Sequence, residues 1–326
     1  MAKKNNTREK VKKERKRTNF FGIGNKIAFC FVVPMLFMAW IGISAYEKAA
    51  EGMSDQFVDS TTQTIEMARQ YIDMGCSFVE SEGFNYAYDT ELARYFLGIL
   101  EPMEKNAIVT QARSDMLSSQ TSNAYIQNIH IITSDVVNML SSTATNIEAE
   151  SILTEHKAEV GDGKRSVKHW IDKHDAVDQA FGVQKDDYIL AYEVLSQLNN
   201  ACVVIDIKPD VILDFLKGLN LGEGSIVGFV TESGRELYQE NLAEGMESVL
   251  TAGEPVFFGQ DFYTEAMQVL APVEGETEDA AAEKVFSGVK SVEYKGRDYY
   301  FVYSISEKLS ASVYALVPEQ LVIGQA

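Results

Sequence analysis

The sequence predicts an α+β protein in which an N-terminal transmembrane helix and a long stalk helix precede two antiparallel sheets. Three observations support this prediction. A run of twenty uncharged, mostly apolar residues occupies 27–46, and a helical spacing of apolar residues follows it. From Tyr125 onward, a pattern of hairpin, helical excursion and strand meander occurs twice. Alternation with a period of two is typical of strands, and spacing of three to four is typical of helices.

Residues 27–46 predict a membrane-spanning helix, because twenty helical residues cover about 30 Å, the thickness of a bilayer's hydrocarbon core. Residues 1–26 contain ten basic and two acidic residues, and such basic flanks stay in the cytoplasm. We therefore expect a basic cytoplasmic tail, a single pass at 27–46 and an extracytoplasmic region over 47–326. The alternative is a cleaved secretory signal, whose apolar region is about 7 to 15 residues long. The longer run here, which contains Trp40, favours the anchor.

Charge is divided unevenly along the chain. The tail carries +8, and because the whole chain carries −19, the remaining 300 residues carry −27. Such an acidic exterior repels nucleic acid and anionic lipid surfaces. We therefore predict no nucleic-acid partner, and we assign the basic tail to orientation and anionic-lipid contact.

Three cysteines are too few for a disulfide scaffold. Cys30 lies in the apolar run, which leaves Cys76 and Cys202 outside the membrane. Either a single bridge or two buried thiols fits this pattern.

Residues 47–124 are predicted to form the stalk and connecting helices. Apolar or small residues follow helical spacing at Phe57, Thr61, Ile65, Ala68, Ile72, Cys76 and Val79. We expect Gly83 to interrupt this helix. A second helical stretch covers 90–123 and contains Pro102, which the first turn of a helix tolerates.

Two units of strands follow. In the first unit, 125–220, we expect a hairpin of 126–132 with 136–140, a polar helix-and-loop segment over 148–184, strands at 188–195 and 201–207, and a helix at 211–219. In the second unit, 221–318, we expect strands at 225–230, 236–238, 289–294, 299–305 and 312–317, with an acidic loop at 274–284.

This order resembles the double Cache extracellular sensors of bacterial chemoreceptors and related transmembrane receptors. The resemblance lies in the overall order, in Val203-Val204-Ile205-Asp206-Ile207, in Phe229-Val230-Thr231-Glu232-Ser233-Gly234, and in the ending Val317-Pro318-Glu319. It implies two PAS-like subdomains, membrane-distal over 125–220 and membrane-proximal over 221–318. It also implies that 319–326 leads into a second transmembrane helix that the sequence does not include.

The resemblance implies the sensory region of a methyl-accepting chemotaxis protein in the bacterial plasma membrane. Such a receptor would bind a small molecule in the distal subdomain, form a homodimer, need no cofactor and act through a cytoplasmic signalling module if the chain continues. One alternative is the sensor of a histidine kinase or of a cyclic-dinucleotide enzyme. Another is a stand-alone membrane-anchored binding or adhesion protein.

The resemblance also places a ligand pocket in the distal subdomain. The residues that could line it are Arg165, Lys168, Trp170, Tyr188, Tyr192 and Asp206. Strand alternation would place Tyr188 and Tyr192 on one face, so that both rings cover the same cavity. A carboxylate beside aromatic rings suits an ammonium group, and Arg165 or Lys168 would meet a carboxylate, so an amino acid, an amine or a carboxylate is expected as the ligand.

Two observations limit this assignment. The amino-acid-sensing members carry an Arg-x-Trp-Tyr pattern, whereas here Arg165 lies five residues before Trp170 and Ile171 replaces the tyrosine. Trp170 and both tyrosines also fit ordinary core packing. Asp206 stands apart, because a carboxylate in so apolar a strand requires a partner.

Enzymatic patterns are poorly represented. His169 and His174 are five residues apart, which would place them on different faces of a helix and argues against zinc. The chain has neither a Gly-x-Ser-x-Gly elbow nor a phosphate-binding glycine loop. We predict that the protein is not an enzyme and has no catalytic or metal-binding residues.

Overall fold

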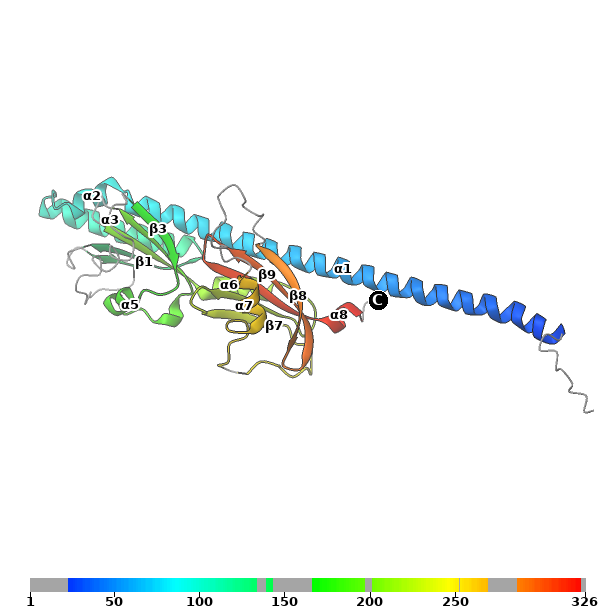
Figure 1. The fold of residues 1–326 in the computed structure, drawn as a ribbon. Coiled ribbons are helices and arrows are strands. Elements are labelled where there is room, and N and C mark those ends of the chain that lie inside the picture. Colours follow the sequence, from blue (N-terminus) through cyan, green and yellow to red (C-terminus); the bar gives the residue numbers. More distant parts are fainter. Residues whose placement is uncertain are drawn as a thin grey trace, which may run out of the picture. The chain divides into compact units, whose positions relative to one another are not determined.

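A computed structural model describes residues 23–133, 139–142, 166–196, 201–251, 253–268 and 286–323. The chain divides into two compact units, Met1–Met53 and Ser54–Ala326. Both sheets belong to the larger of these, Ser54–Ala326 (Figure 1).

Three helices begin the described chain: α1 (Ile23–Ala87), α2 (Thr90–Phe96) and α3 (Pro102–Ser122). Asp89 caps α2, since its Oδ1 accepts the Leu92 N–H at 2.8 Å. Pro102 opens α3 at a position where no N–H is needed. By length and composition, α1 is the one helix of the described residues that could cross a membrane.

The expected break of α1 at Gly83 is wrong, because the helix continues to Ala87. A Cβ at Gly83 would lie 2.9 Å from the ring of Tyr192. Glycine at this position therefore permits a close approach of the helix to the sheet rather than ending the helix.

Sheet A consists of β1 (Ile126–Thr133), β2 (Leu140–Ser141), β3 (Ser166–Ile171), β4 (Ala191–Ser196) and β5 (Ala201–Ile207), in the order β2-β1-β5-β4-β3. Between β3 and β4 the chain forms helix α5 (Asp175–Phe181) and a 3₁₀ turn, η2 (Lys185–Asp187). Helix α6 (Pro209–Lys217) follows β5.

Sheet B consists of β6 (Ile226–Thr231), β7 (Glu236–Glu240), β8 (Ser287–Tyr294), β9 (Arg297–Ser306) and β10 (Ala311–Pro318), in the order β7-β6-β10-β9-β8. Helix α7 (Asp261–Gln268) lies between β7 and β8 in the sequence, and α8 (Glu319–Ile323) follows β10. The two sheets have the same strand order, and every neighbouring pair within them is antiparallel. The repeated unit predicted from the sequence is confirmed.

Two parts of the predicted first unit differ from the structure. Strand β3 occupies a segment predicted to be helix and loop, and strand β4 begins at Ala191 rather than at Tyr188. The predicted returning strand over 136–140 lies mostly outside the described residues, which include only its end, at β2. The predicted loop at 274–284 also lies outside them.

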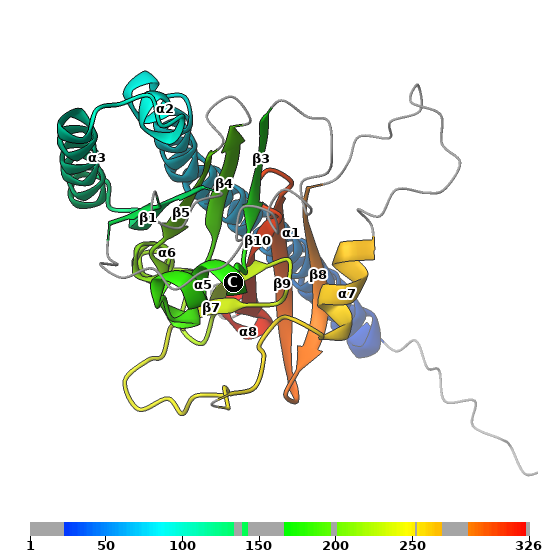
Figure 2. The ribbon, with the colours of Figure 1, turned by 90° about the vertical axis from the view of Figure 1, so that its left-hand side faces the viewer.

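One face of each sheet packs against α1, and Figures 1 and 2 show this helix running alongside both sheets. The shared core contains Ile65, Ile72 and Cys76 of α1, together with alternate residues of the strands. The opposite face of sheet A packs against α5, and the opposite face of sheet B packs against α7. Cys30, Cys76 and Cys202 form no disulfide, which agrees with the buried-thiol alternative for the last two.

Candidate functional site

The face of sheet A that is turned away from α1 carries buried polar and charged side chains. Strand alternation places Asn128 and His130 of β1, Glu193 of β4 and Asp206 of β5 on this face. The segment between β3 and β4 adds His174, Asp178 and Tyr188 above the sheet. We call Asn128, His130, His174, Asp178, Tyr188 and Asp206 the histidine–carboxylate cluster, and all six side chains are buried.

Asp206 is the centre of the cluster. Its carboxylate accepts hydrogen bonds from His174 Nε2 at 2.8 Å and from Asn128 Nδ2 at 3.0 Å, and it lies 3.5 Å from His130 Nε2. Burial acts to raise the pKa of Asp206, but its contacts with His130 and His174 hold this pKa well below its usual range. The prediction that Asp206 requires a partner in its apolar strand is confirmed.

His174 lies between two carboxylates, at the residue before α5. Its Nε2 contacts Asp206, and its Nδ1 lies 3.0 Å from Asp178 Oδ1. Burial alone would lower the pKa of this imidazole, but the bonds to Asp178 and Asp206 raise it to about 10. Both ring nitrogens therefore carry protons, and His174 is a buried imidazolium.

Tyr188 connects two members of the cluster. Its ring stacks on that of His174 with centroids 4.2 Å apart, and its hydroxyl donates to Asp178 Oδ2 at 3.2 Å. Burial, followed by the negative charge of Asp178, raises the pKa of the Tyr188 hydroxyl. Tyr188 therefore acts as a neutral hydrogen-bond donor to Asp178.

A second pair, half-buried His169 and buried Glu193, extends the polar face toward the edge strand. His169 Nε2 of β3 lies 3.1 Å from Glu193 Oε2, and the Cys202 thiol donates to Glu193 Oε1 at 3.4 Å. His130 bonds Ser141 through Nδ1 at 2.9 Å. Three of the chain's four histidines therefore lie on this one face. No group of three or more His, Cys, Asp or Glu within the described ranges has the arrangement of a metal site.

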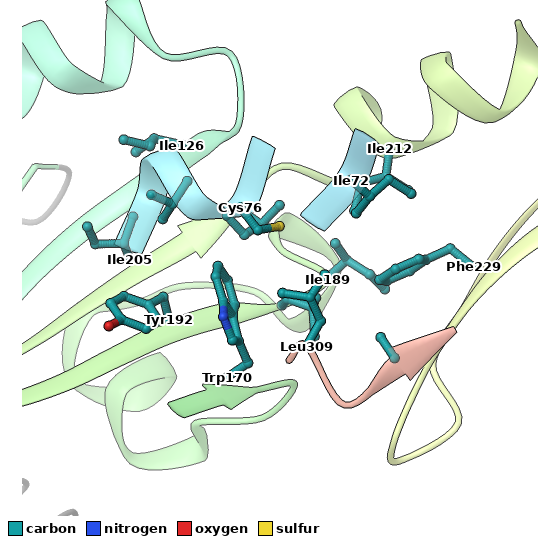
Figure 3. Packing of buried hydrophobic residues seen from close by; sticks show 14 of the residues in the cluster. Ile72, Cys76, Ile126, Trp170, Ile189, Tyr192, Ile205, Ile212, Phe229 and Leu309 are labelled. Carbon is teal, nitrogen blue, oxygen red and sulfur yellow. The ribbon is translucent and has the colours of Figure 1, made fainter. Parts of the chain in front are cut away.

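Trp170 and Tyr192 lie on the opposite face of sheet A, against α1. Their ring centroids are 5.0 Å apart, and the indole N–H donates to Glu80 of α1 at 2.9 Å. Figure 3 shows both rings in the shared core, near Cys76. These two residues do not join Asp206, and their contacts are those of core packing.

The expectation that Tyr188 and Tyr192 cover one cavity is wrong, since they belong to different core clusters. Strand alternation does not reach Tyr188, because β4 begins three residues after it. Of the other predicted site residues, Arg165 lies outside the described residues. Lys168 belongs to β3, but its side chain lies outside the described part of the structure.

Sequence reasoning missed His130, Asp178 and the role of His174 as the partner of Asp206. A signal for His130 was present, because Asn128 and His130 are polar residues two positions apart in an isoleucine-rich strand. This is the pattern that singled out Asp206 in β5. His174 gave no such signal, because its loop has no periodicity.

The corresponding face of sheet B is packed with aromatic rings. The ring of Tyr314 stacks on those of Phe257 and Phe301, with centroid distances of 5.6 and 5.4 Å. Phe262 and Tyr263 of α7 complete this core. The same arrangement of strands therefore encloses charged groups in one sheet and rings in the other.

Comparison with known proteins gives matches among solved structures alone: no protein-family model matches the chain, and neither does any curated protein. A domain of a sensory box/GGDEF family protein from Vibrio parahaemolyticus matches with 10% identity and a TM-score of 0.49, over 83% of this chain and 99% of that one. The sensor domain of the Vibrio cholerae histidine kinase DctB matches with 9% identity and a TM-score of 0.45, over 81% and 98%.

The ligand-binding domain of the Pseudomonas aeruginosa amino acid chemoreceptor PctC, solved with GABA, matches with 9% identity and a TM-score of 0.46, over 80% and 99%. The arrangement of elements predicted from the sequence is confirmed by the chain's own topology, which has a long N-terminal helix with an apolar run followed by two five-stranded sheets of identical order.

Proposed function

We propose that this chain is the extracytoplasmic sensing region of a membrane-anchored receptor, with its sensory site on the polar face of sheet A. One observation carries the proposal. Two sheets of identical topology differ in what they enclose, because one encloses the histidine–carboxylate cluster and the other an aromatic core. Buried charges are expensive to maintain, and an apolar core would serve stability equally well, so we infer that the cluster serves function.

The chemistry of the cluster favours a small charged ligand. Asp206 already holds a cation, the His174 imidazolium, and an ammonium group could replace it there. His174 would then be free to meet a carboxylate. An amino acid, an amine or a carboxylate thus remains the ligand class that fits, and its binding would break an internal ion pair. The ligand can shift the receptor only by its differential affinity for the two arrangements.

The N-terminal sequence supports a membrane anchor. The described part of α1 includes the apolar run, and ten basic residues precede that run. We propose a single pass in the bacterial plasma membrane with the two-sheet unit outside. A chemotaxis module is our preferred output over a kinase or a cyclic-dinucleotide enzyme, and sequencing the gene beyond the codon for Ala326 tests this choice.

A homodimer is part of this proposal. Met67, Met74 and Phe78 of α1 are 61%, 52% and 62% exposed, on the side opposite the buried residues Ile65, Ile72 and Val79. Their separations of seven and four residues follow a heptad seam, which is self-complementary between two copies of one helix.

A thermal-shift screen of the purified unit Ser54–Ala326 tests the sensing role. Amino acids, amines and carboxylates are added singly at constant pH and ionic strength. A ligand at a hundred times its dissociation constant should stabilise the unit by about 2.7 kcal/mol. Saturable stabilisation by one compound class supports direct sensing. A folded unit that no compound stabilises opposes it and favours an adhesion role or indirect sensing.

A further inference from the structure

Arg235 lies in the turn between β6 and β7, and its guanidinium reaches the segments that connect β3 to β4. Nη1 donates to the carbonyl oxygens of Asp172 at 2.7 Å and of Ile189 at 3.4 Å. Nη2 donates to the carbonyl oxygens of Lys185 and Tyr188. A planar guanidinium with five donors can hold four carbonyl groups at once, which an ammonium group cannot do with the same geometry.

The same turn is held a second time by Asp172. Its Oδ2 accepts the hydroxyl of Thr231 at 2.5 Å and the backbone N–H of Ser233 at 2.9 Å. Burial acts to raise the pKa of Asp172, but the hydrogen bonds from Ser233 and Thr231 lower it below its usual value. The turn of sheet B and the connections of sheet A therefore bind each other in both directions.

These contacts reach the histidine–carboxylate cluster directly. The guanidinium carbon of Arg235 lies 4.8 Å from the ring centroid of Tyr188, the ring that stacks on His174. Asp172 precedes His174 by two residues. The segments that hold Arg235 are thus the segments that place His174 and Tyr188 beside Asp206 and Asp178. The carbonyl groups around Arg235 therefore belong to the same segment as His174 and Tyr188 of the cluster.

The next residue continues the connection into sheet B. Successive side chains of a strand point to opposite faces, and Glu236 accepts the backbone N–H groups of Val256 at 2.7 Å, Phe257 at 2.9 Å and Phe258. Strand β6, which ends at the turn, pairs along its length with β10, and β10 leads into α8. The turn therefore contacts the histidine–carboxylate cluster through Arg235. It also follows directly on β6, the strand that pairs with the C-terminal strand β10.

We propose that Arg235 is the residue that couples the histidine–carboxylate cluster of sheet A to sheet B. It transmits rearrangements of the segment 172–189 to the hairpin β6–β7. The proposal rests on the proposed function only in taking ligand binding as the cause of the rearrangement. The test therefore uses no ligand.

The test is hydrogen exchange by mass spectrometry on the full chain in lipid nanodiscs, read on peptides covering 231–240. The trigger is Asp206→Asn, which keeps the side-chain shape and removes the charge that holds His174. It is introduced into four backgrounds: wild type, Arg235→Gln, Arg235→Lys and Arg297→Gln. Arg297 is a matched control, because it is an arginine of sheet B, at the start of β9, whose side chain is exposed.

We expect the trigger to raise exchange in 231–240 about fivefold or more in the wild-type and Arg297→Gln backgrounds, the change that a typical intersite coupling gives. In the Arg235→Gln and Arg235→Lys backgrounds, the hairpin should exchange at the same rate with and without the Asp206→Asn trigger. A merely structural role for Arg235 would raise baseline exchange but would not remove the response to the trigger.

Tyr188→Phe serves as a second, milder trigger if Asp206→Asn does not fold, since it removes only the hydrogen bonds of the Tyr188 hydroxyl to Asp178 and to the backbone N–H of His174. An equal response in the Arg235→Gln and wild-type backgrounds would overturn the proposal, as would no response in wild type. Failure of the ligand screen would leave this result intact, so the two proposals fail separately.

Discussion

Asp206, His174 and Asp178 place two carboxylates and one imidazolium in an interior where charges are costly. Removing ions from water costs several kcal/mol for each ion, and close pairing recovers this cost only with good geometry. Here the charges are closely paired, because His174 lies between the carboxylates of Asp178 and Asp206, and Asp206 has three polar neighbours. The stability of the cluster therefore depends on the protonation of His174.

The pH dependence of stability follows from the pKa of His174. Its pKa rises from 6.5 to about 10 on folding, so the folded state binds this proton more tightly than the unfolded state. The resulting stabilisation is fully present below pH 6.5 and is lost as pH rises through 10. We expect the free energy of unfolding, measured by urea titration at pH 6, 8 and 10, to fall over this interval. The fall should be smaller in His174→Gln, and an equal fall in both proteins would contradict the assignment.

Tyr192 presents the opposite case, a buried polar group without a partner. Its hydroxyl has no hydrogen-bond partner among the described residues, although the ring is only 1% exposed. Removing an unsatisfied hydroxyl relieves its desolvation cost, so Tyr192→Phe should leave the unfolding free energy unchanged or raise it by about 1 kcal/mol. Chemical denaturation measures this. A loss of stability would mean that the hydroxyl forms a bond that the structure does not contain.

At the scale of elements, two glycines of α1 in different surroundings make a matched pair. A Cβ at Gly75 would lie 2.1 Å from the ring of Tyr125, whereas a Cβ at Gly52 would meet nothing within 4 Å. Gly75→Ala should therefore lower the unfolding free energy by about 1–3 kcal/mol through overpacking. Gly52→Ala should change it slightly in the favourable direction, because alanine is the better helix former by about 1 kcal/mol. Equal effects of both substitutions would contradict this account of the helix packing.

The exposed seam on α1 predicts how the chain associates. Charged residues at Met74 and Phe78 would oppose pairing of the seam, so Met74→Glu combined with Phe78→Glu should convert dimers to monomers. Met103→Glu is the control, since Met103 is 86% exposed and belongs to α3 rather than to α1. Sedimentation of the full chain in detergent micelles measures the change. A double variant that remains dimeric would place the interface elsewhere.

The elements show what sequence patterns can supply. Strand β5 was predicted with its exact bounds, because seven apolar-rich residues end at a proline that opens α6. Strand β3 was missed, because its residues Ser166-Val167-Lys168-His169-Trp170-Ile171 have no clean alternation and form an edge strand. In the candidate site, Asp206 was recognisable from its own strand. Its partner His174 was not recognisable, since His174 and Asp206 are far apart in the sequence and meet only where the segment between β3 and β4 lies over the sheet.

At the scale of the whole chain, one topology serves two purposes. Sheet A holds a charged face, sheet B holds an aromatic core, and the turn with Arg235 joins them. Sheet B also has a cavity of about 320 Å³, lined by Val230, Tyr263, Met267 and neighbouring residues. A ligand bound in that cavity would place the sensory site in sheet B instead of sheet A.

Hydrogen exchange with and without a bound ligand locates the sensory site on the chain. The compound found by the thermal screen is added to the full chain in nanodiscs, and hydrogen exchange is compared with and without it. We predict that the ligand changes protection over 126–133, 172–189 and 201–207, the strands and connections that carry the histidine–carboxylate cluster. Protection confined to 226–240 and 261–268, around the cavity of sheet B, would contradict the claim that the cluster is the sensory site.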